Sequence, residues 1–405
     1  MPRVLLLLPS STYRAGDFVA AAEVLGAEVV VASDRRQALA GLMGERALRV
    51  DLRHPEKAAE TIVDAAARVP IDAVVAVDDQ GVLVAALAGA RLGVAHNPPA
   101  AVAATRDKAA LRRALDVAGV PQPAFRVAGP DDDVAALASA VGLPCVVKPL
   151  SLSASRGVLR ADDARAATAA AARIRALLCH EDAGDQSLLV ERYLPGTEVA
   201  VEGLLREGRL VVLALFDKPD PMEGPTFEET LLVTPSRLPR TTQATITATV
   251  ADATAAIGLR EGPVHAEVRV GPGGEVGMLE VAARSIGGLC SRTLRFGLGL
   301  SLEEVILRHA LGLPLDALAS AYDASGVLML PIPRAGTLSA VRGQDAARAV
   351  PGVVDVEITV PIGRPVQPLP EGDRYLGFVF ARAASPAAVE GALRAAGDHL
   401  DVAIE

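Results

Sequence analysis

The chain has 405 residues, which is enough for two or three domains with substantial hydrophobic cores. Its formal net charge of −9, its aromatic content of 3% and its lack of tryptophan argue against a surface that binds and stacks nucleic acid. Cys145, Cys179 and Cys290 form no CxxC pair, which excludes a cysteine-based zinc site and fits a reducing compartment. The apolar run at residues 4–8 is too short for a signal peptide, and no segment is long enough to cross a bilayer. We therefore expect a cytoplasmic protein without nucleic-acid or membrane partners.

The first hundred residues predict an open α/β sheet. Apolar runs over residues 3–8, 28–32 and 73–77 are typical of buried parallel strands, and helices are predicted over 17–25 and 55–69. In such sheets ligands gather at the carboxyl ends of the strands, where this sequence offers Ser10, Ser11, Thr12, Tyr13, Arg14 and Asp78. The segment lacks a GxGxxG fingerprint, which argues against a dinucleotide.

A boundary follows at Asn97-Pro98-Pro99, and a different pattern begins after it. The sequence then predicts a helix over 106–118, a strand over 145–148, a serine-rich loop over 151–157 and an alanine-rich helix over 161–178.

A second lobe is predicted from residue 187 onward. Strands are expected over 187–191, 198–205 and 210–216, and a helix over 243–257. Residues 217–240 are rich in Pro, Glu and Thr with weak periodicity, which indicates a long loop, and such loops are usually functional lids or disordered. The residues after 315 alternate short strands and helices and end in a helix and a strand over 386–405. The expected parts are residues 1–100, residues 101–315 with lobes 101–186 and 187–315 and a lid over 217–240, and residues 316–405.

The segment between residues 263 and 288 carries the most informative pattern. Two alternating runs, 265–270 and 276–282, flank a Gly-Pro-Gly-Gly-Glu turn and predict an antiparallel hairpin. If the two adjacent glycines form a two-residue loop, Glu267 lies directly opposite Glu280. Opposed residues lie about 5 Å apart at Cβ, and like charges there destabilise the sheet. Such a pair of carboxylates needs a divalent cation or a shared proton.

Two further residues belong to this hairpin. Arg284 follows Glu280 by four positions and adds a fixed cation, and two carboxylates with an arginine around Mg²⁺ suit a transferring phosphoryl group. His265 shares a face with Glu267, because side chains alternate along a strand. It could contact a substrate or help to remove a proton from an attacking amine, although a lone strand histidine is more often a packed residue.

Two lysines lie at positions that suit phosphate groups. Lys148 ends a strand and precedes a loop of small residues, in which Ser153, Ser155 and Gly157 offer hydroxyl and backbone donors. A solvated lysine beside a polar turn is the simpler alternative. Lys108 lies in the first turn of its helix, where a cation is unfavourable against the helix dipole. That conflict suggests a ligand, although an exposed lysine also explains it.

The segment ERYLPGTE joins two predicted strands. Its Glu191, Arg192, Tyr193 and Leu194 can present backbone groups to a purine edge, and Glu198 can accept from ribose hydroxyls. A charged turn between strands is the plain alternative.

Further candidates concern a substrate. Gly287 and Gly288 let backbone N–H groups face a carboxylate, with Arg292 close in sequence. In the predicted lid, Glu228 and Glu229 could meet an ammonium group or simply solvate an exposed loop.

Taken in order across residues 106–313, these elements resemble the ATP-grasp superfamily. The segments EVAARSIGG and GPTFEETLLVTPSRL resemble its carboxylate–amine ligase branch, close to L-amino acid ligases, and biotin carboxylase is more distantly similar. The resemblance implies an α/β protein with an N-terminal open parallel sheet, a central two-lobed ATP-grasp domain of α+β type and a small C-terminal α+β domain.

The resemblance also implies roles for individual residues. ATP phosphates would be held by Lys108 and Lys148 with the serine-rich loop, adenine by Glu191 and residues 192–194, ribose by Glu198, and Mg²⁺, or Mn²⁺ in its place, by Glu267 and Glu280. Arg284 would neutralise the phosphoryl group and the tetrahedral intermediate, so Arg284, Lys148 and His265 are the catalytic candidates. One position departs from the family. Ala282 stands where the family commonly has an asparagine that binds metal, so a second metal ion should bind more weakly.

The function that the resemblance implies is ATP-dependent ligation of a small carboxylate to an amine through an acyl phosphate, with an L-amino acid as the acid and a homodimer as a compatible assembly. One alternative is an ATP-grasp enzyme for another carboxylate, such as formate or bicarbonate. Another, motivated by Ala282, is a catalytically degenerate nucleotide-binding protein.

Overall fold

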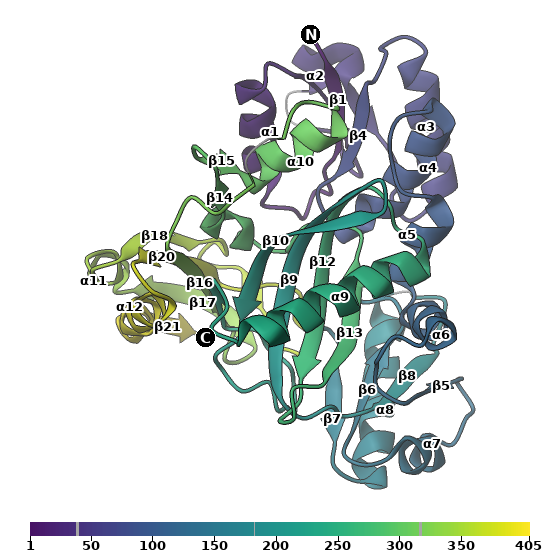
Figure 1. The fold of residues 1–405 in the computed structure, drawn as a ribbon, viewed down its shortest axis with the longest axis vertical. Coiled ribbons are helices and arrows are strands. Elements are labelled where there is room, and N and C mark those ends of the chain that lie inside the picture. Colours follow the sequence, from purple (N-terminus) through teal and green to yellow (C-terminus); the bar gives the residue numbers. More distant parts are fainter. Residues whose placement is uncertain (38–39, 182, 316–317) are drawn as a thin grey trace.

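The computed structural model of the protein describes residues 1–37, 40–181, 183–315 and 318–405 (Figure 1). Its amino-terminal part is a parallel four-stranded sheet of order β3-β2-β1-β4 between helices. The strands are β1 (Arg3–Leu7), β2 (Glu28–Ser33), β3 (Ala47–Arg49) and β4 (Ala73–Ala76), and the helices include α1 (Ala15–Val24), α2 (Ala40–Met43), α3 (Pro55–Ala66) and α4 (Val82–Leu92). The predicted open parallel α/β sheet is confirmed. No helix within the described ranges is long and apolar enough to cross a membrane.

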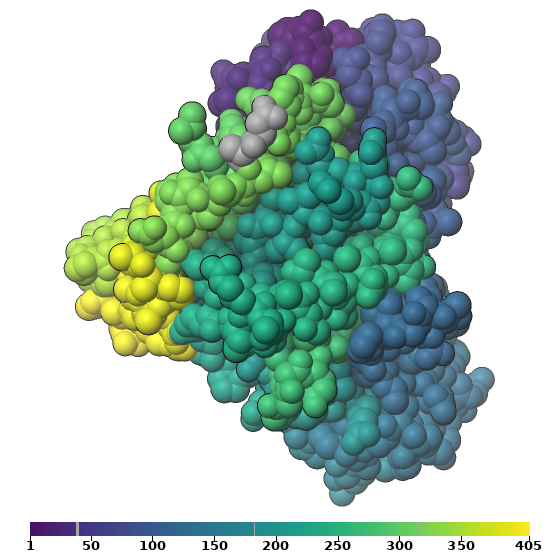
Figure 2. Space-filling model, in the orientation of Figure 1, coloured from purple at the N-terminus to yellow at the C-terminus, as the bar shows by residue number. Residues whose placement is uncertain are grey.

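The first lobe is built on an antiparallel sheet of order β5-β8-β6-β7. Its elements are α5 (Pro99–Arg106), α6 (Lys108–Ala118), β5 (Phe125–Ala128), α7 (Val134–Val141), β6 (Cys145–Pro149), β7 (Leu159–Ala161), α8 (Ala164–His180) and β8 (Leu188–Arg192). Helices α7 and α8 bury their apolar faces against this sheet, where Val147, Val190 and Ile174 are almost fully buried. In the space-filling view this lobe, in blue, forms the lower right part of the molecule, whereas the yellow C-terminal residues lie on the left (Figure 2).

The helix predicted over 106–118 corresponds to α6, which begins two residues later than predicted. Asp107 leaves the helical conformation, with φ −122° and ψ 104°, and its carboxylate accepts hydrogen bonds from the backbone N–H groups of Ala109 and Ala110. It is therefore the N-cap of α6, and Lys108 is the first residue of that helix.

The centre of the molecule is an eight-stranded sheet of order β13-β12-β9-β10-β11-β16-β20-β18. Its strands are β9 (Thr197–Arg206), β10 (Arg209–Asp217), β11 (Leu231–Thr234), β12 (Gly262–Val270), β13 (Val276–Ala282), β16 (Ala324–Leu330), β18 (Val353–Ile358) and β20 (Gly377–Ala383). Helix α9 (Arg240–Ile257) crosses one face of this sheet (Figure 1). Its Ile246 and Val250 are fully buried there against strand residues such as Val264.

The single loop predicted over 217–240 is wrong, because the segment contains a strand of the central sheet. Strand β11 pairs with β10 and β16, and its four residues are all buried. A short strand buried on both faces shows no alternation of polar and apolar residues, so its pattern resembles a loop. The remaining loop, residues 218–230, crosses to the first lobe, where Thr226 forms a bridge with Leu159.

The hairpin of β12 and β13 pairs Glu267 with Glu280, as predicted, but through a different turn. Gly271 accepts from the N–H of Gly274 and donates to the carbonyl of Glu275, so the loop has three residues, 272–274. A register shift after Glu267, on the β13 side at Leu279, compensates for the extra residue. The extra turn residue and the register shift thus compensate for each other. Glu267 therefore pairs with Glu280, as expected for a two-residue loop.

The C-terminal residues extend the central sheet and add a small three-stranded sheet of order β19-β17-β21. The remaining elements are β14 (Arg295–Phe296), β15 (Leu300–Ser301), α10 (Leu302–Ala310), β17 (Gly336–Arg342), α11 (Gln344–Arg348), β19 (Pro365–Val366), α12 (Pro386–Asp398) and β21 (Asp401–Ile404). The predicted final helix and strand correspond to α12 and β21. The expected domain boundary at residue 316 falls on residues 316–317, outside the described residues. The central sheet contains strands from both sides of that position.

Candidate functional site

A cavity of about 490 Å³ lies where the amino-terminal part, the two lobes and the C-terminal residues meet. The structure brings most of the predicted site residues to its wall. They are Lys108, Lys148, Ser153, Ser155, Glu191, Arg192, Tyr193, Leu194, Glu198, His265, Glu267, Glu280, Arg284, Gly287 and Gly288. Of the strand-end residues predicted in the amino-terminal sheet, Ser11, Thr12, Tyr13, Arg14 and Asp78 also line it. Ser10 does not, because it hydrogen bonds to Asp34 instead.

Two predicted ligand residues, Gly157 and Arg292, do not line the cavity and have other partners in this structure. The N–H of Gly157 donates to the carbonyl of Pro370 at 2.9 Å, so it is not free for a phosphate. Arg292 lies away from the cavity wall and forms ion pairs with Asp17, at 3.0 Å, and with Glu357.

Of the two glutamates in the predicted lid, Glu228 was the predicted substrate contact, but the structure places Glu229 at the cavity. Glu229 lines the cavity, whereas Glu228 does not. Burial raises the pKa of the Glu228 carboxyl above its usual value. Of the two, Glu229 is therefore the candidate for contact with a cationic group.

Lys148, at the end of β6, is held in a buried ion-pair network. Its Nζ lies 2.7 Å from Glu191 Oε2, and Arg112 of α6 donates to the other carboxylate oxygen of Glu191. Burial alone would raise the pKa of Glu191, but the charges of Arg112 and Lys148 outweigh it and lower the pKa to about 2. Glu191 is therefore an anion that orients Lys148 toward the cavity. The sequence interpretation missed Arg112, which lies one helical turn after Lys108 and is 1% exposed.

Lys108 connects the serine-rich loop to the glutamate pair. Its Nζ donates to the carbonyl of Leu152 at 2.6 Å and lies 3.9 Å from Glu280 Oε1. The Lys108 side chain is 10% exposed, so its charge faces the cavity from a nearly buried position.

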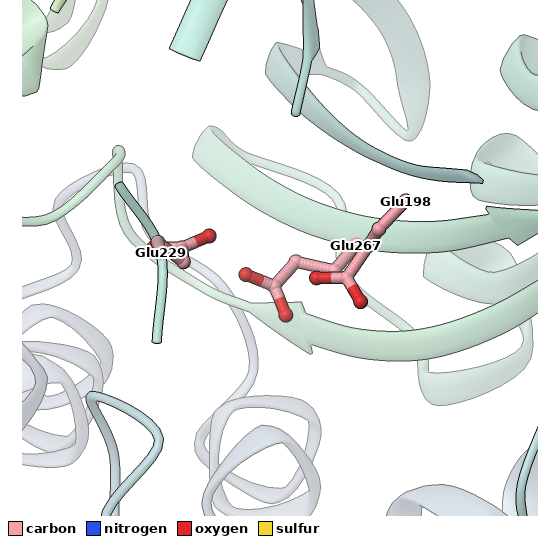
Figure 3. Close-up of side chains that lie close together, drawn as sticks. All are labelled: Glu198, Glu229 and Glu267. Atoms are coloured by element: carbon pink, nitrogen blue, oxygen red, sulfur yellow. The ribbon is translucent and has the colours of Figure 1, made fainter. Parts of the chain in front are cut away.

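Lys218, which the sequence interpretation did not single out, lies beneath the same wall. Its ammonium is 2.6 Å from Glu198 Oε1 and 3.1 Å from Glu267 Oε1, and it also pairs with Glu229. The carboxylates of these three glutamates approach within 4.8 Å of one another, with Glu229 facing the other two (Figure 3). Burial alone would raise the pKa of Glu267, but attraction to Lys218 and His265 lowers it well below the usual range. The side chain of Lys218 thus already supplies the cation for this cluster.

The predicted ribose contact, Glu198, has both oxygens engaged by cations. Oε1 pairs with Lys218, and Oε2 lies 3.1 Å from the guanidinium of Arg269. Arg269 in turn donates to the hydroxyl of Tyr193 at 2.8 Å and to the carbonyl of Leu194 at 3.1 Å. Arg269 therefore holds the ERYLPGTE segment in its bent course beside the cavity.

His265 is enclosed by two carboxylates. Its Nδ1 lies 3.2 Å from Glu202 Oε2, and its Nε2 lies 3.7 Å from Glu267 Oε1. Burial alone would lower the pKa of His265, but these partners raise it to about 9. These two carboxylates thus favour the protonated imidazole in this arrangement, and a role of His265 in removing a proton from an amine stays a prediction.

Arg284 is oriented by the amino-terminal part. Its Nε lies 3.0 Å from Asp79 Oδ1, and its Nη2 donates to Oδ2 of the same carboxylate at 3.2 Å. Asp79 begins a short 3₁₀ helix after β4, and Arg106 approaches it at 3.5 Å. Burial alone would raise the pKa of Asp79, but Arg284 and Arg106 hold it well below its usual range. The sequence placed Asp78 at this strand end, and the next residue proves to be the partner of Arg284.

One end of the cavity is apolar. Ile286, Cys290, Met329 and Tyr375 line it, and the sulfur atoms of Cys290 and Met329 are 3.6 Å apart. Tyr375 packs edge-on against the ring of Phe378, with centroids 6.1 Å apart. This end offers an apolar and sulfur-rich surface to a bound molecule.

Comparison with known families agrees with this geometry. A family model of the ATP-grasp domain matches residues 141–293, one of the ATP-grasp N-terminal domain matches residues 19–96, and one named L-amino acid ligase C-terminal domain 2 matches residues 328–405. The chain contains an ATP-grasp domain and, before it, an ATP-grasp N-terminal domain.

Several curated proteins are similar to this ATP-grasp chain. An uncharacterized protein of Sinorhizobium fredii, y4rH, is 29% identical over 300 residues, which are 74% of this chain and 61% of that protein. Alanine–anticapsin ligase of Bacillus subtilis is 26% identical over 269 residues, covering 62% and 56% of the two chains. Carnosine synthase 1 of Gallus gallus is 31% identical over 307 residues, covering 70% and 32%. The chain thus spans less than two thirds of the length of these relatives.

Solved structures share the fold of this chain. The crystal structure of an L-amino acid ligase from Bacillus licheniformis matches with a TM-score of 0.81 at 22% identity, over 100% of this chain and 99% of that one. The biotin carboxylase domain of the 2-oxoglutarate carboxylase from Hydrogenobacter thermophilus, in a complex with MgADP and bicarbonate, matches with a TM-score of 0.71 at 16% identity, over 99% and 90%.

Proposed function

We propose that this chain is an ATP-dependent carboxylate–amine ligase. In the first step it would phosphorylate the carboxylate of an L-amino acid to an acyl phosphate and release ADP. In the second step an amine would displace phosphate to form an amide or peptide bond. The observation that carries the proposal is the convergence of Lys108, Lys148, Glu267, Glu280 and Arg284 on one cavity. The names of alanine–anticapsin ligase, carnosine synthase and L-amino acid ligase among its relatives support the same reaction class.

In this proposal the first lobe binds the nucleotide. Lys108 and Lys148 offer positive charge to the phosphates, and Ser153 and Ser155 add hydroxyl donors from the loop between β6 and β7. Residues 192–194 line the same cavity. Because the N–H groups of Arg192 and Tyr193 donate to the carbonyls of Ala124 and Pro144, the backbone N–H of Leu194 is the group proposed to pair with the adenine edge. Because Glu191 and Arg112 hold Lys148 in place, its charge needs little reorganisation when a phosphate binds.

The glutamate pair fits a magnesium ion. Glu267 and Glu280 are cross-strand partners, both line the cavity, and carboxylate oxygens are the ligands that Mg²⁺ prefers. The Glu280 side chain is 33% exposed and, within the described ranges, its one ion-pair partner is Lys108 at 3.9 Å, so it is available to a metal. Mg²⁺ bound there would neutralise charge on the transferring phosphoryl group. Ala282 also lines the cavity but offers no ligand atom.

Arg284 would act in both chemical steps. A carboxylate oxygen of the acid attacks the γ-phosphorus and ADP leaves, then the amine nitrogen attacks the acyl carbon and phosphate leaves. Negative charge develops first on phosphoryl oxygens and then on the tetrahedral oxyanion. The two contacts with Asp79 fix the guanidinium plane, so its donors are oriented before the reaction begins.

The far end of the cavity would receive the acid. Cys290, Met329 and Tyr375 can pack against an apolar side chain, while Glu229 and Asp78 offer negative charge to an α-ammonium group. This combination suits an α-amino acid with an apolar side chain better than formate or bicarbonate, which have none.

The experiment that tests the proposal is a matrix of acids and amines screened for ATP-dependent phosphate release. We expect turnover with at least one apolar L-amino acid as the acid. Turnover stimulated by bicarbonate and by no amino acid would contradict the proposal and favour a carboxylase.

A further inference from the structure

A loop of the C-terminal part reaches across to the first lobe. The strap, defined as residues 367–375 between β19 and β20, carries two carbonyls that face the serine-rich loop. The N–H of Gly157 donates to Pro370 at 2.9 Å, and Arg156 Nε donates to the carbonyl of Glu371 at 3.2 Å. The strap therefore holds the end of the loop to which the proposed function assigns the ATP phosphates.

The side chain of Glu371 adds a second attachment to the same lobe. Its Oε1 accepts from Arg173 Nε at 2.6 Å and its Oε2 accepts from Arg173 Nη2 at 2.9 Å, which is a bidentate fork. Arg173 belongs to α8, the long helix of the first lobe. Bidentate arginine–carboxylate pairs fix geometry better than single contacts, so this pair joins the two parts in one relative position.

The other end of the strap lines the substrate end of the cavity. Asp373, Arg374 and Tyr375 are part of the cavity wall, and Tyr375 is packed against Phe378 of β20. One short segment thus contacts the phosphate end through Glu371 and the apolar end through Tyr375.

We propose that the strap positions the phosphate-binding loop, that Glu371 is its positioning residue, and that it couples occupation of the acid pocket to ATP binding. The proposal rests on the proposed ligase function. The Glu371 fork keeps the first lobe closed on the cavity, so the loop is ordered before ATP arrives. A bound acid that packs on Tyr375 stabilises the strap and therefore the loop.

The test uses the full chain with Glu371→Gln, which keeps the backbone contacts and removes the charge of the fork. We expect backbone hydrogen exchange in residues 151–158 to become at least about threefold faster. We expect the KM for ATP to rise about two- to fivefold with kcat within about twofold, as loss of one partly exposed ion pair implies. The charge swap Arg173→Glu with Glu371→Arg should restore both values.

A matched control is Asp401→Asn, which removes an exposed ion pair with Arg342 in the same C-terminal part, at 3.1 Å and away from the cavity. It should leave exchange in 151–158 and the KM for ATP unchanged. Unchanged exchange in 151–158 for Glu371→Gln, or equal effects of both variants, would overturn the proposal. A wild-type protein without ATP turnover would instead overturn the ligase function, and hydrogen exchange in Glu371→Gln would still decide the role of the strap.

Discussion

The two glutamates of the hairpin should respond differently to the same isosteric substitution. Glu267 is partnered by Lys218 at 3.1 Å and by His265 at 3.7 Å, and its side chain is 24% exposed. Glu267→Gln leaves two buried cations with less compensation, and we expect it to lower the free energy of unfolding by about 1–3 kcal/mol. Among the residues that the structure describes, the ion-pair partner of Glu280 is Lys108 at 3.9 Å, so Glu280→Gln should leave stability unchanged or slightly higher, because repulsion across the ladder is relieved.

Both variants should lose Mg²⁺-dependent turnover, since each removes one proposed metal ligand. Thermal unfolding without nucleotide and phosphate release at several Mg²⁺ concentrations measure the two effects separately. We expect a melting temperature lower by a few degrees for Glu267→Gln only. Equal destabilisation by both substitutions would contradict the assignment of Lys218 and His265 as partners of Glu267, and Glu280→Gln with near wild-type turnover would refute the metal site.

Three other predictions follow from the ion pairs around the cavity. Lys148→Met should weaken ATP binding by about 1–3 kcal/mol but leave adenosine binding unchanged, as measured by calorimetry, and equal losses for both ligands would argue against a phosphate contact. Arg284→Lys should keep ATP affinity and lower kcat by about 10²–10³, because lysine lacks the planar guanidinium that Asp79 holds in place, and near wild-type kcat would contradict this role. Glu191 has a folded-state pKa of about 2, below its ordinary value of 4.5, so its stabilising contribution is present above pH 4.5 and is lost as pH falls toward 2. The difference in unfolding free energy between wild type and Glu191→Gln should therefore shrink over that range, and a constant difference in acid denaturation experiments would argue against the network.

Local patterns predicted much of the fold and failed where long-range packing decides. Alternation predicted β12 and β13 and the Glu267–Glu280 pair, although a longer turn and a bulge replaced the expected geometry. Strand β11 was missed, because a four-residue strand buried on both faces has no alternation to detect. The helix predicted from residue 106 begins two residues later, because the side chain of Asp107 caps α6, a contact that an aspartate before Lys108 could have suggested.

The sequence likewise predicted the site residues that local patterns mark and missed those whose partners are distant in the chain. Residues with a charge at a strand end, such as Lys148, were found from the sequence, and the structure places them at the cavity. Lys218 and Asp79 were missed because their importance lies in partners that are distant in the chain, Glu198, Glu267 and Arg284. A linear pattern contains no signal for such pairs, because only folding brings them within hydrogen-bond distance.

The central claim is that the chain activates a carboxylate as an acyl phosphate. The most direct measurement adds hydroxylamine to the protein with ATP, Mg²⁺ and single L-amino acids, since hydroxylamine converts an activated acyl group to a stable hydroxamate. We predict a hydroxamate with at least one apolar amino acid, formed in proportion to ADP and absent for Glu280→Gln. ATP turnover without any hydroxamate across the amino acids, or turnover that depends on bicarbonate instead, would contradict the claim.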